Sequence, residues 1–258
     1  MYKSKRRELN IKIYEDTLEY VDELSLTSKL SSTQKLKMKS QETIFGYKKK
    51  FDKTIVQVLN QDVIKTVIDL HITNNQQINL KKNILVLNLA SKKHFGGGVK
   101  NGAMAQEEEL FRKTTYGKHS GSELYPLKLN EFTFTPEVYV IKDENYTRLE
   151  ANKIFPVDML AISALANPIL VNGKLNESNY NLTFEKIETI FKFGLHNGNE
   201  NLVLGALGCG VFNNPPMDII EMFNICLKKY NGYFANIIFS VKSIYDENFE
   251  LFNKNIMR

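Results

Sequence analysis

The feature that most constrains the fold of this chain is an alternation between apolar, β-branched runs and segments whose apolar residues recur three and four positions apart. The run "NILVLNLAS" (83–91) is typical of a buried strand, whereas "QDVIKTVIDLH" (61–71) has helical spacing. Strands are predicted at 54–60, 83–91, 137–142, 159–166, 201–208 and 236–243, and helices at 61–71, 106–115, 184–196 and 217–230. This order is typical of an α/β sheet covered by helices on both faces.

No repeat or low-complexity linker divides the chain, so a single domain over residues 1–258 is predicted. Residues 30–50 combine helical spacing with serines and a threonine that suit helix caps, which predicts one or two helices. We therefore expect an N-terminal helical extension (1–52) before the α/β core (53–258).

Composition excludes several classes of function. No run approaches the roughly 20 apolar residues of a membrane span, and no apolar h-region follows the basic start, which favours the cytoplasm or nucleus and no membrane partner. Cys209 and Cys226 cannot build a disulfide framework, and with four scattered histidines they form no metal-ligand cluster. Neither a metal nor another cofactor is expected, and nothing predicts an assembly beyond the monomer.

The net charge is +5, and the lysines of "KLKMKS" and "GYKKKF" would suit a polyanion. The alternative is that they reflect the lysine, asparagine and isoleucine usage of the whole chain, as an A+T-rich coding sequence would produce. No aromatic interleaving or recognised motif supports sequence-specific nucleic-acid binding.

Two glycine-rich loops follow predicted strands, where ligands collect in α/β sheets. They are "FGGGVKNG" after 83–91 and "GALGCGVFNN" at the end of 201–208. Glycine lets backbone N–H groups approach an anion, so the pair suits a diphosphate. Each loop could instead be an ordinary turn. A dinucleotide-binding fingerprint is a weak competitor, because Asn213 replaces its third glycine.

Three glutamates, Glu107 to Glu109, follow the first loop and open a predicted helix. They could simply complement the helix dipole. Successive helical residues point about 100° apart, however, so at most two can address one pocket, and Glu109 is expected to face solvent. Two carboxylates beside a sugar could divide glycosidic cleavage, with one gripping ribose hydroxyls and the other protonating the leaving oxygen.

The motif "GGG", seven residues, then "QEE" (96–98 and 106–108) resembles the signature of the poly(ADP-ribose) glycohydrolases. "NLAS" before it and "GALGCGVFNNPP" after it are similar to the bacterial-type branch, and the resemblance covers roughly 54–252. It implies a macrodomain-like, three-layer α/β/α mixed sheet with an N-terminal helical extension. It also implies a glycosidase that hydrolyses the ribose–ribose bonds of poly(ADP-ribose), mainly from the free end, and releases ADP-ribose.

The resemblance assigns Glu108 as the catalytic acid/base and Glu107 as the carboxylate that holds ribose. It implies further binding residues in both loops: Ser91, Gly96, Gly97, Gly98, Gln106, Gly208, Cys209, Gly210, Val211 and Phe212. Gly208 to Val211 would contact the diphosphate, and Phe212 would press on the terminal ribose. The chain departs from the family at Phe95, where bacterial enzymes often have proline, and at Lys242, where many macrodomains place an aromatic under adenine.

The mechanism that follows has Glu108 protonate the leaving oxygen and then act as base for water, without a metal. The partners are poly(ADP-ribose) and ADP-ribosylated proteins. Two alternatives stay open: a hydrolase of mono-ADP-ribosylated proteins or small ADP-ribose derivatives, and a non-catalytic ADP-ribose reader, against which the intact "QEE" argues. Cys209 as a nucleophile lacks an evident histidine partner.

Overall fold

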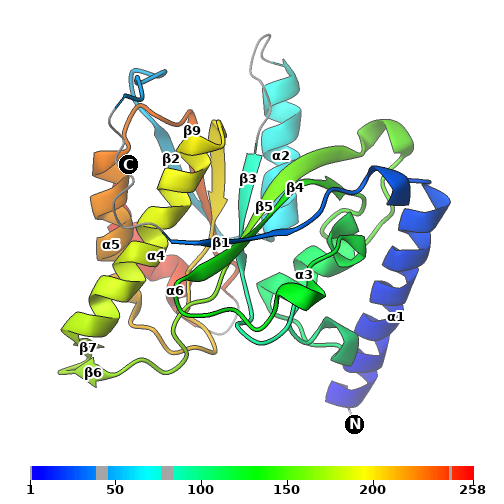
Figure 1. The fold of residues 1–258 in the computed structure, drawn as a ribbon, viewed down its shortest axis with the longest axis horizontal. Helices are drawn as coiled ribbons and strands as arrows, with labels where there is room; N and C mark the ends of the chain where they lie inside the picture. Colours follow the sequence, from blue (N-terminus) through cyan, green and yellow to red (C-terminus); the bar gives the residue numbers. More distant parts are fainter. Residues whose placement is uncertain (1, 39–45, 77–83, 244–245) are drawn as a thin grey trace. The chain divides into compact units, whose positions relative to one another are not determined.

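The computed structural model describes residues 2–38, 46–76, 84–243 and 246–258 (Figure 1). The contacts within the chain define two compact units, one of residues 1–36 and 88–163 and one of residues 37–87 and 164–258. Among the described residues, no helix combines the length and apolar character that a membrane crossing requires.

The first unit combines helices with antiparallel strands. Its elements are α1 (Tyr2–Glu23), β1 (Gln34–Lys37), the end of β3 (Ile84–Leu89), α3 (Gln106–Lys113), β4 (Glu131–Val140) and β5 (Phe155–Ile162). Strands β4 and β5 pair with Thr133 opposite Ala161 and Val138 opposite Val157. The buried apolar residues of these strands form much of the core of this unit.

Helix α1 is held to this unit through polar contacts and lies beside α3 (Figure 1). Thr17 Oγ1 donates to the carbonyl of Arg112 at 2.6 Å, and Asn10 Nδ2 donates to the carbonyl of Gly102 at 3.0 Å. The buried ammonium of Lys142 donates to Asp16 at 2.5 Å and to Thr17 Oγ1 at 2.7 Å. The N-terminal helix therefore supports both the glycine loop and the helix that carries the glutamates.

The second unit is built on parallel strands in the order β3, β8 (Asn201–Leu204), β9 (Asn236–Ser240) and β2 (Ile55–Leu59). Its helices are α2 (Val63–Gln76), α4 (Glu177–His196), α5 (Pro216–Lys229) and α6 (Asn248–Asn255), and a small hairpin joins β6 (Leu170–Val171) to β7 (Lys174–Leu175).

Adjacent residues of β9 show that helices cover both faces of these parallel strands. The Phe239 ring packs against Phe223 of α5 and Phe252 of α6. On the opposite face, Ser240 Oγ accepts a hydrogen bond of 3.0 Å from Thr66 of α2. Because neighbouring strand residues point to opposite faces, α2 lies on one side and α5 and α6 on the other, as the alternation predicted.

The helix prediction for 30–50 is wrong where the structure describes it. A short 3-10 turn at Thr27–Lys29 precedes strand β1, and residues 39–45 lie outside the described part of the chain. Strand β1 is largely exposed and carries lysines, so no apolar alternation marks it. The sequence also did not predict α1, α6 or the β6–β7 hairpin as separate elements.

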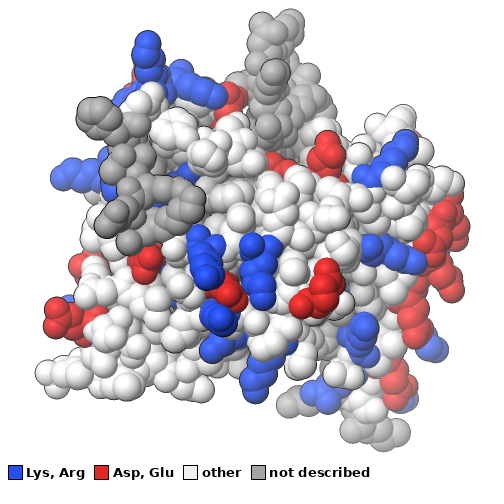
Figure 2. Space-filling model, viewed as in Figure 1, with Lys and Arg blue, Asp and Glu red and all other residues white. Residues whose placement is uncertain are grey.

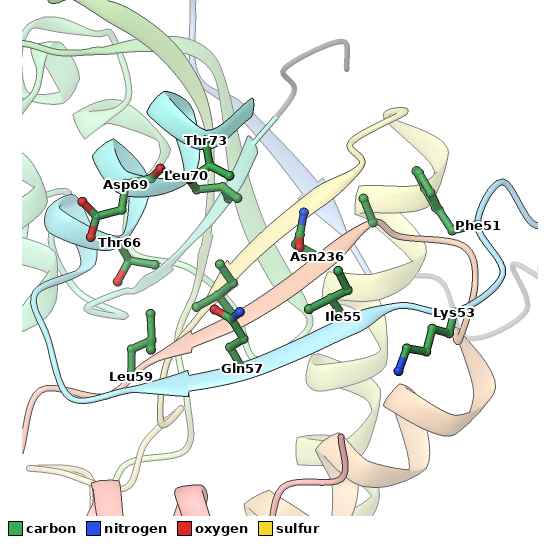
Figure 3. Close-up of a pocket in the computed structure, with 12 residues that line it drawn as sticks. Phe51, Lys53, Ile55, Gln57, Leu59, Thr66, Asp69, Leu70, Thr73 and Asn236 are labelled. Carbon is green, nitrogen blue, oxygen red and sulfur yellow. Dashed lines mark hydrogen bonds between the residues drawn. The ribbon is translucent and has the colours of Figure 1, made fainter. Parts of the chain in front are cut away.

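A groove of about 500 Å³ lies in the second unit between α2 and β2 (Figure 3). Ile55, Gln57 and Leu59, at alternate positions of β2, line one side of it, and Leu70 of α2 lines the other. The polar residues of α2 here have partners, since Asp69 binds Lys65 and Thr66 binds Ser240. The groove carries none of the residues predicted for the active site.

Lysine and arginine side chains are interspersed with acidic side chains on the face shown in Figure 2. Two lysines of the basic N-terminal segments have acidic partners, because Lys35 lies 3.8 Å from Glu131 and Lys50 lies 3.1 Å from Glu200. This favours the interpretation of these lysines as general surface charge over a dedicated polyanion site.

Candidate active site

The three glutamates occupy the first turn of α3, after Ala105 in an extended conformation at the N-cap. Carboxylates in a first turn interact favourably with the helix dipole. Only two of the three turn toward the glycine loop, as helical geometry predicted. The glutamate motif therefore divides into a site pair, Glu107 and Glu108, and a third residue with another role.

Glu108 is buried, with 6% of its surface exposed. Its Oε1 accepts a hydrogen bond of 2.8 Å from the backbone N–H of Gly98. Within the described part of the chain, its buried Oε2 has no hydrogen-bond partner. One oxygen is thus fixed by the loop, and the other carries no protein hydrogen bond that a ligand would have to displace.

Glu107 is even more deeply buried and is held by polar groups at the end of β3 and directly after it. Its Oε2 accepts from the backbone N–H of Ser91 at 2.6 Å, and its Oε1 accepts from Asn88 Nδ2 at 3.4 Å. Burial raises the pKa of Glu107 to about 8, and the charge of Glu108 acts in the same direction. The carboxyl group of Glu107 therefore keeps its proton near neutral pH.

Gly97 lies directly against both carboxylates. A Cβ at this position would lie 2.4 Å from Glu108 Oε1 and 2.8 Å from Glu107 Oε2, and its φ is +56°. Glycine is required for both the conformation and the approach. The triple-glycine motif therefore brings backbone against the two glutamates, which explains why the two motifs occur together.

Gly97→Ala is expected to lower kcat/KM by about 100-fold, because displacing a catalytic group by about 1 Å costs this much. The positive φ alone destabilises the variant by about 1–2 kcal/mol. Gly198→Ala is the matched control, since Gly198 has φ of +78° and no atom within 4 Å of a Cβ. Steady-state kinetics and melting curves on both variants test this, and equal activity of the two variants would contradict it.

The raised pKa of Glu107 predicts how stability changes with pH. Between about pH 4.5 and pH 8 the unfolded chain releases this proton while the folded protein keeps it, so this residue makes the free energy of unfolding fall as pH rises. The Glu107→Gln variant has no proton to release here. Its free energy of unfolding should therefore rise by roughly 1–4 kcal/mol relative to that of the natural protein as the pH increases across this range. Denaturant titrations of both proteins at about pH 4.5 and about pH 8 measure this difference in unfolding free energy. If the unfolding free energies of the two proteins changed in parallel with pH, the raised pKa of Glu107 would be refuted.

Glu109 does not face solvent, so that prediction is wrong. Its carboxylate lies 2.7 Å from Arg112 and 2.8 Å from Lys113, and it accepts a hydrogen bond of 2.7 Å from Tyr146. Arg112 and Lys113 are fully buried, and Arg112 also donates to the carbonyl of Ala103 at 2.8 Å. Glu109 therefore neutralises two buried cations and anchors α3.

Three further predicted residues, Gln106, Ser91 and Gly96, are in this unit. Gln106 Oε1 accepts from the backbone N–H of Leu89 at 2.9 Å and so ties the start of α3 to the end of β3. Ser91 donates its backbone N–H to Glu107, while its Oγ accepts from the backbone N–H groups of Lys93 and His94. Gly96 has φ of +79° and packs against the ring of Phe111.

The second predicted loop, Gly208 to Phe212, lies in the second unit after β8. Within the described chain, the N–H groups of Gly210, Val211 and Phe212 donate to no protein acceptor. Val211 is 85% exposed, and a Cβ on Gly210 would meet no atom within 4 Å. Successive unpaired N–H groups form an anion-binding concavity, so this loop can hold a phosphate.

Asn214 shapes this loop and was not among the predicted residues. Its buried Nδ2 donates to the carbonyls of Leu165, Gly208 and Phe212 at 2.7, 3.1 and 3.2 Å. Its place directly before Pro215 and Pro216 was the available sequence signal. Cys209 is a poor nucleophile here, because burial raises the pKa of its thiol to about 12.

No group of three or more histidine, cysteine or acidic side chains with metal-binding geometry occurs among the described residues. His119 is buried, with Nδ1 2.8 Å from the carbonyl of Ser31 and Nε2 3.1 Å from Thr115 Oγ1. Its role is structural.

The fold and the paired glutamates define a class: a macrodomain-like α/β protein with a glycosidase site. Residues 10–143 match the family described as microbial-type PARG, catalytic domain, which includes the glycine and glutamate motifs. The chain belongs to this family of poly(ADP-ribose) glycohydrolases. The predicted family and glycosidase class are thereby confirmed. No functionally curated protein matches the sequence.

Solved structures confirm the predicted fold class. Poly(ADP-ribose) glycohydrolase from Thermomonospora curvata has 21% identity and a TM-score of 0.75, covering 98% of this chain and 99% of its own. The same enzyme bound to the inhibitor ADP-HPD has a TM-score of 0.72 at 21% identity, over 97% of this chain and 98% of its own. The Deinococcus radiodurans enzyme in complex with ADP-ribose has 21% identity and a TM-score of 0.71, covering 90% and 96%.

Proposed function

We propose that this protein hydrolyses the ribose–ribose O-glycosidic bonds of poly(ADP-ribose), with Glu108 as the acid/base and Glu107 as the ribose ligand. The observation that carries the proposal is the buried, unpaired Oε2 of Glu108, beside a second buried carboxyl and held by the glycine loop. Family membership and the ADP-ribose and inhibitor complexes of the similar enzymes support the substrate class.

In the proposed reaction, Glu108 transfers a proton to the oxygen that leaves the anomeric carbon of ribose, and an oxocarbenium-like centre develops there. Glu107 accepts hydrogen bonds from ribose hydroxyls and fixes the sugar against Glu108. Water then attacks the anomeric carbon while Glu108 takes up its proton. Gly98 keeps Oε1 of Glu108 in place throughout, so that only Oε2 takes part in proton transfer.

The loop from Gly208 to Phe212 is proposed to bind the diphosphate of ADP-ribose through its backbone N–H groups. Gly210→Val should lower ADP-ribose affinity at least about tenfold because a side chain there obstructs the anion. Stability should change by less than about 0.5 kcal/mol, since no protein atom lies near the new Cβ. Calorimetry with ADP-ribose measures the change in affinity. Undiminished affinity would show that this loop does not bind the diphosphate.

Finer features of the proposal rest on the resemblance. Cleavage proceeds mainly from the free end of the polymer, with Phe212 against the terminal ribose. The whole chain acts as one monomeric catalytic domain, with 1–52 as its extension and 53–258 as its core, in the cytoplasm or, in a eukaryote, the nucleus.

The test uses defined poly(ADP-ribose) and, in parallel, singly ADP-ribosylated protein, with product analysis over time. We expect early release of ADP-ribose from the polymer and no release from the singly modified protein. Release from the singly modified protein only would favour a mono-ADP-ribosyl hydrolase, and binding without any product would favour a reader. Early accumulation of oligomers would overturn cleavage from the free end.

A further inference from the structure

Among the described residues of the first unit, the buried side-chain polar atoms without a hydrogen-bond partner include four outside α3. They are Asn88 Oδ1, Tyr116 Oη, Tyr125 Oη and Thr133 Oγ1. Asn88, Tyr116 and Thr133 have no exposed surface. A buried polar atom without a partner destabilises the folded state, so such atoms ordinarily bind internal water or serve a site.

These groups face one another although they come from separate segments. The Tyr116 hydroxyl is within interaction range of the side chains of Asn88, Thr133 and Thr135, and the Tyr125 hydroxyl is within range of Thr133 and Tyr116, although none of these contacts has full hydrogen-bond geometry. Both tyrosine hydroxyls also feel the charge of Glu107, and Asn88 Nδ2 reaches Glu107 Oε1 only at 3.4 Å. The polar groups therefore lie together near the carboxyl group of Glu107.

Aromatic rings enclose this polar cluster. The Phe95 ring lies 4.9 Å from Phe111, 5.1 Å from Tyr116 and 5.8 Å from Tyr125, between ring centroids. Phe95 is one of the two departures from the family pattern. Its ring packs against the rings of both tyrosines, and most of the cluster is buried, so polar contacts within the cluster occur in a medium of low polarity, where they are stronger.

We propose that Asn88, Tyr116, Tyr125 and Thr133 form a buried site for internal water that hydrogen-bonds to Glu107 and positions its carboxyl group. An internal water needs two to four polar partners, as this cluster supplies. Hydroxyl groups donate or accept, so the water and the tyrosines can adapt to either protonation state of Glu107. The link to ribose rests on the proposed function, whereas the water site itself does not.

The titratable side chains that face Glu107 are Glu108 on the same helix and the two tyrosines. Glu108 favours the protonated form of Glu107. Hydroxyls that donate through water favour its ionised form, because hydrogen bonds to charged groups are stronger than neutral ones. Removing a tyrosine hydroxyl should therefore raise the pKa of Glu107.

The experiment uses Tyr116→Phe and Tyr125→Phe in the full-length, ligand-free protein. A high-resolution crystal structure should show ordered water bonded to these groups. The ¹³C carboxyl titration of Glu107, assigned by comparison with Glu107→Gln, should move up by about one pH unit in each variant. Melting temperatures should fall, because a hydrogen-bonded hydroxyl is lost.

The control is Tyr230→Phe, which removes another buried hydroxyl that has no partner among the described residues and that feels the charge of Glu188 instead of Glu107. It should leave the Glu107 titration unchanged. An unchanged Glu107 titration in both site variants, a cluster without ordered water, or a rise in their melting temperatures would each overturn the proposal. None of these readouts needs polymer, so failure here is distinct from failure of the proposed hydrolysis.

Discussion

Glu108→Gln should retain ADP-ribose affinity and lose nearly all hydrolysis of poly(ADP-ribose). The amide fills the same space and its oxygen can still accept from Gly98, but it has no proton to exchange at the position of Oε2. Positioned proton transfer contributes about 10²–10⁴-fold to such reactions. Single-turnover rates with defined polymer, beside calorimetry with ADP-ribose, measure the two effects separately.

Glu107→Gln is the variant to compare with Glu108→Gln, because it makes the same substitution one residue away on the same helix. It should weaken both binding and rate, because the amide nitrogen cannot accept a hydrogen bond from a ribose hydroxyl at the position of a carboxyl oxygen. If the glutamates only complemented the helix dipole, both substitutions would leave activity intact and change stability by a few tenths of a kcal/mol. A fully active Glu108→Gln enzyme would falsify the acid/base assignment.

Residues that carry a local pattern were predictable from sequence. The strand at 83–91 is marked by an uninterrupted apolar run, and it is observed as Ile84–Leu89, buried along nearly its whole length. The pairing of Glu107 with Glu108 toward one glycine loop follows from helical geometry together with the proximity of the two motifs in the sequence.

Helix α1 lacked such a pattern, for a physical reason. Its buried positions include Asn10, Thr17 and Val21, so polar side chains occupy much of the face that would ordinarily be apolar. The partners that stabilise those side chains, such as the carbonyls of Gly102 and Arg112, come from residues far along the chain. Periodicity of apolar residues cannot reveal a helix whose contacts are polar and long-range.

The role of Glu109 was only partly predictable. Arg112 and Lys113, three and four residues further along α3, are the positions at which a helix places ion-pair partners. Their full burial depends on tertiary packing, and Tyr146 comes from a distant loop. Sequence spacing therefore indicates the pairs but gives neither their burial nor their contribution to stability.

Glu109→Gln is expected to be the most destabilising of the three glutamate substitutions, by about 3–5 kcal/mol, because removing one partner leaves buried charges uncompensated. Glu150→Gln is the matched control: Glu150 pairs with Lys153 at the same i, i+3 spacing, but 70% of the Glu150 side chain and 61% of the Lys153 side chain are exposed. That exposed pair contributes less than about 1 kcal/mol. Denaturant unfolding of both variants at neutral pH gives the comparison.

The pH dependence of the stability lost in Glu109→Gln identifies the cause of that loss. Burial alone would raise the pKa of Glu109, but the charges of Lys113 and Arg112 outweigh burial and lower it to about 2. A depressed carboxyl pKa contributes stability above the unfolded-state value of about 4.5, and this contribution disappears as the pH falls toward 2. The stability gap between the natural protein and Glu109→Gln should therefore narrow below about pH 4.5, whereas a packing defect would leave a constant gap. A gap that is independent of pH would show that shape, and not the buried charges of Arg112 and Lys113, makes α3 depend on this glutamate.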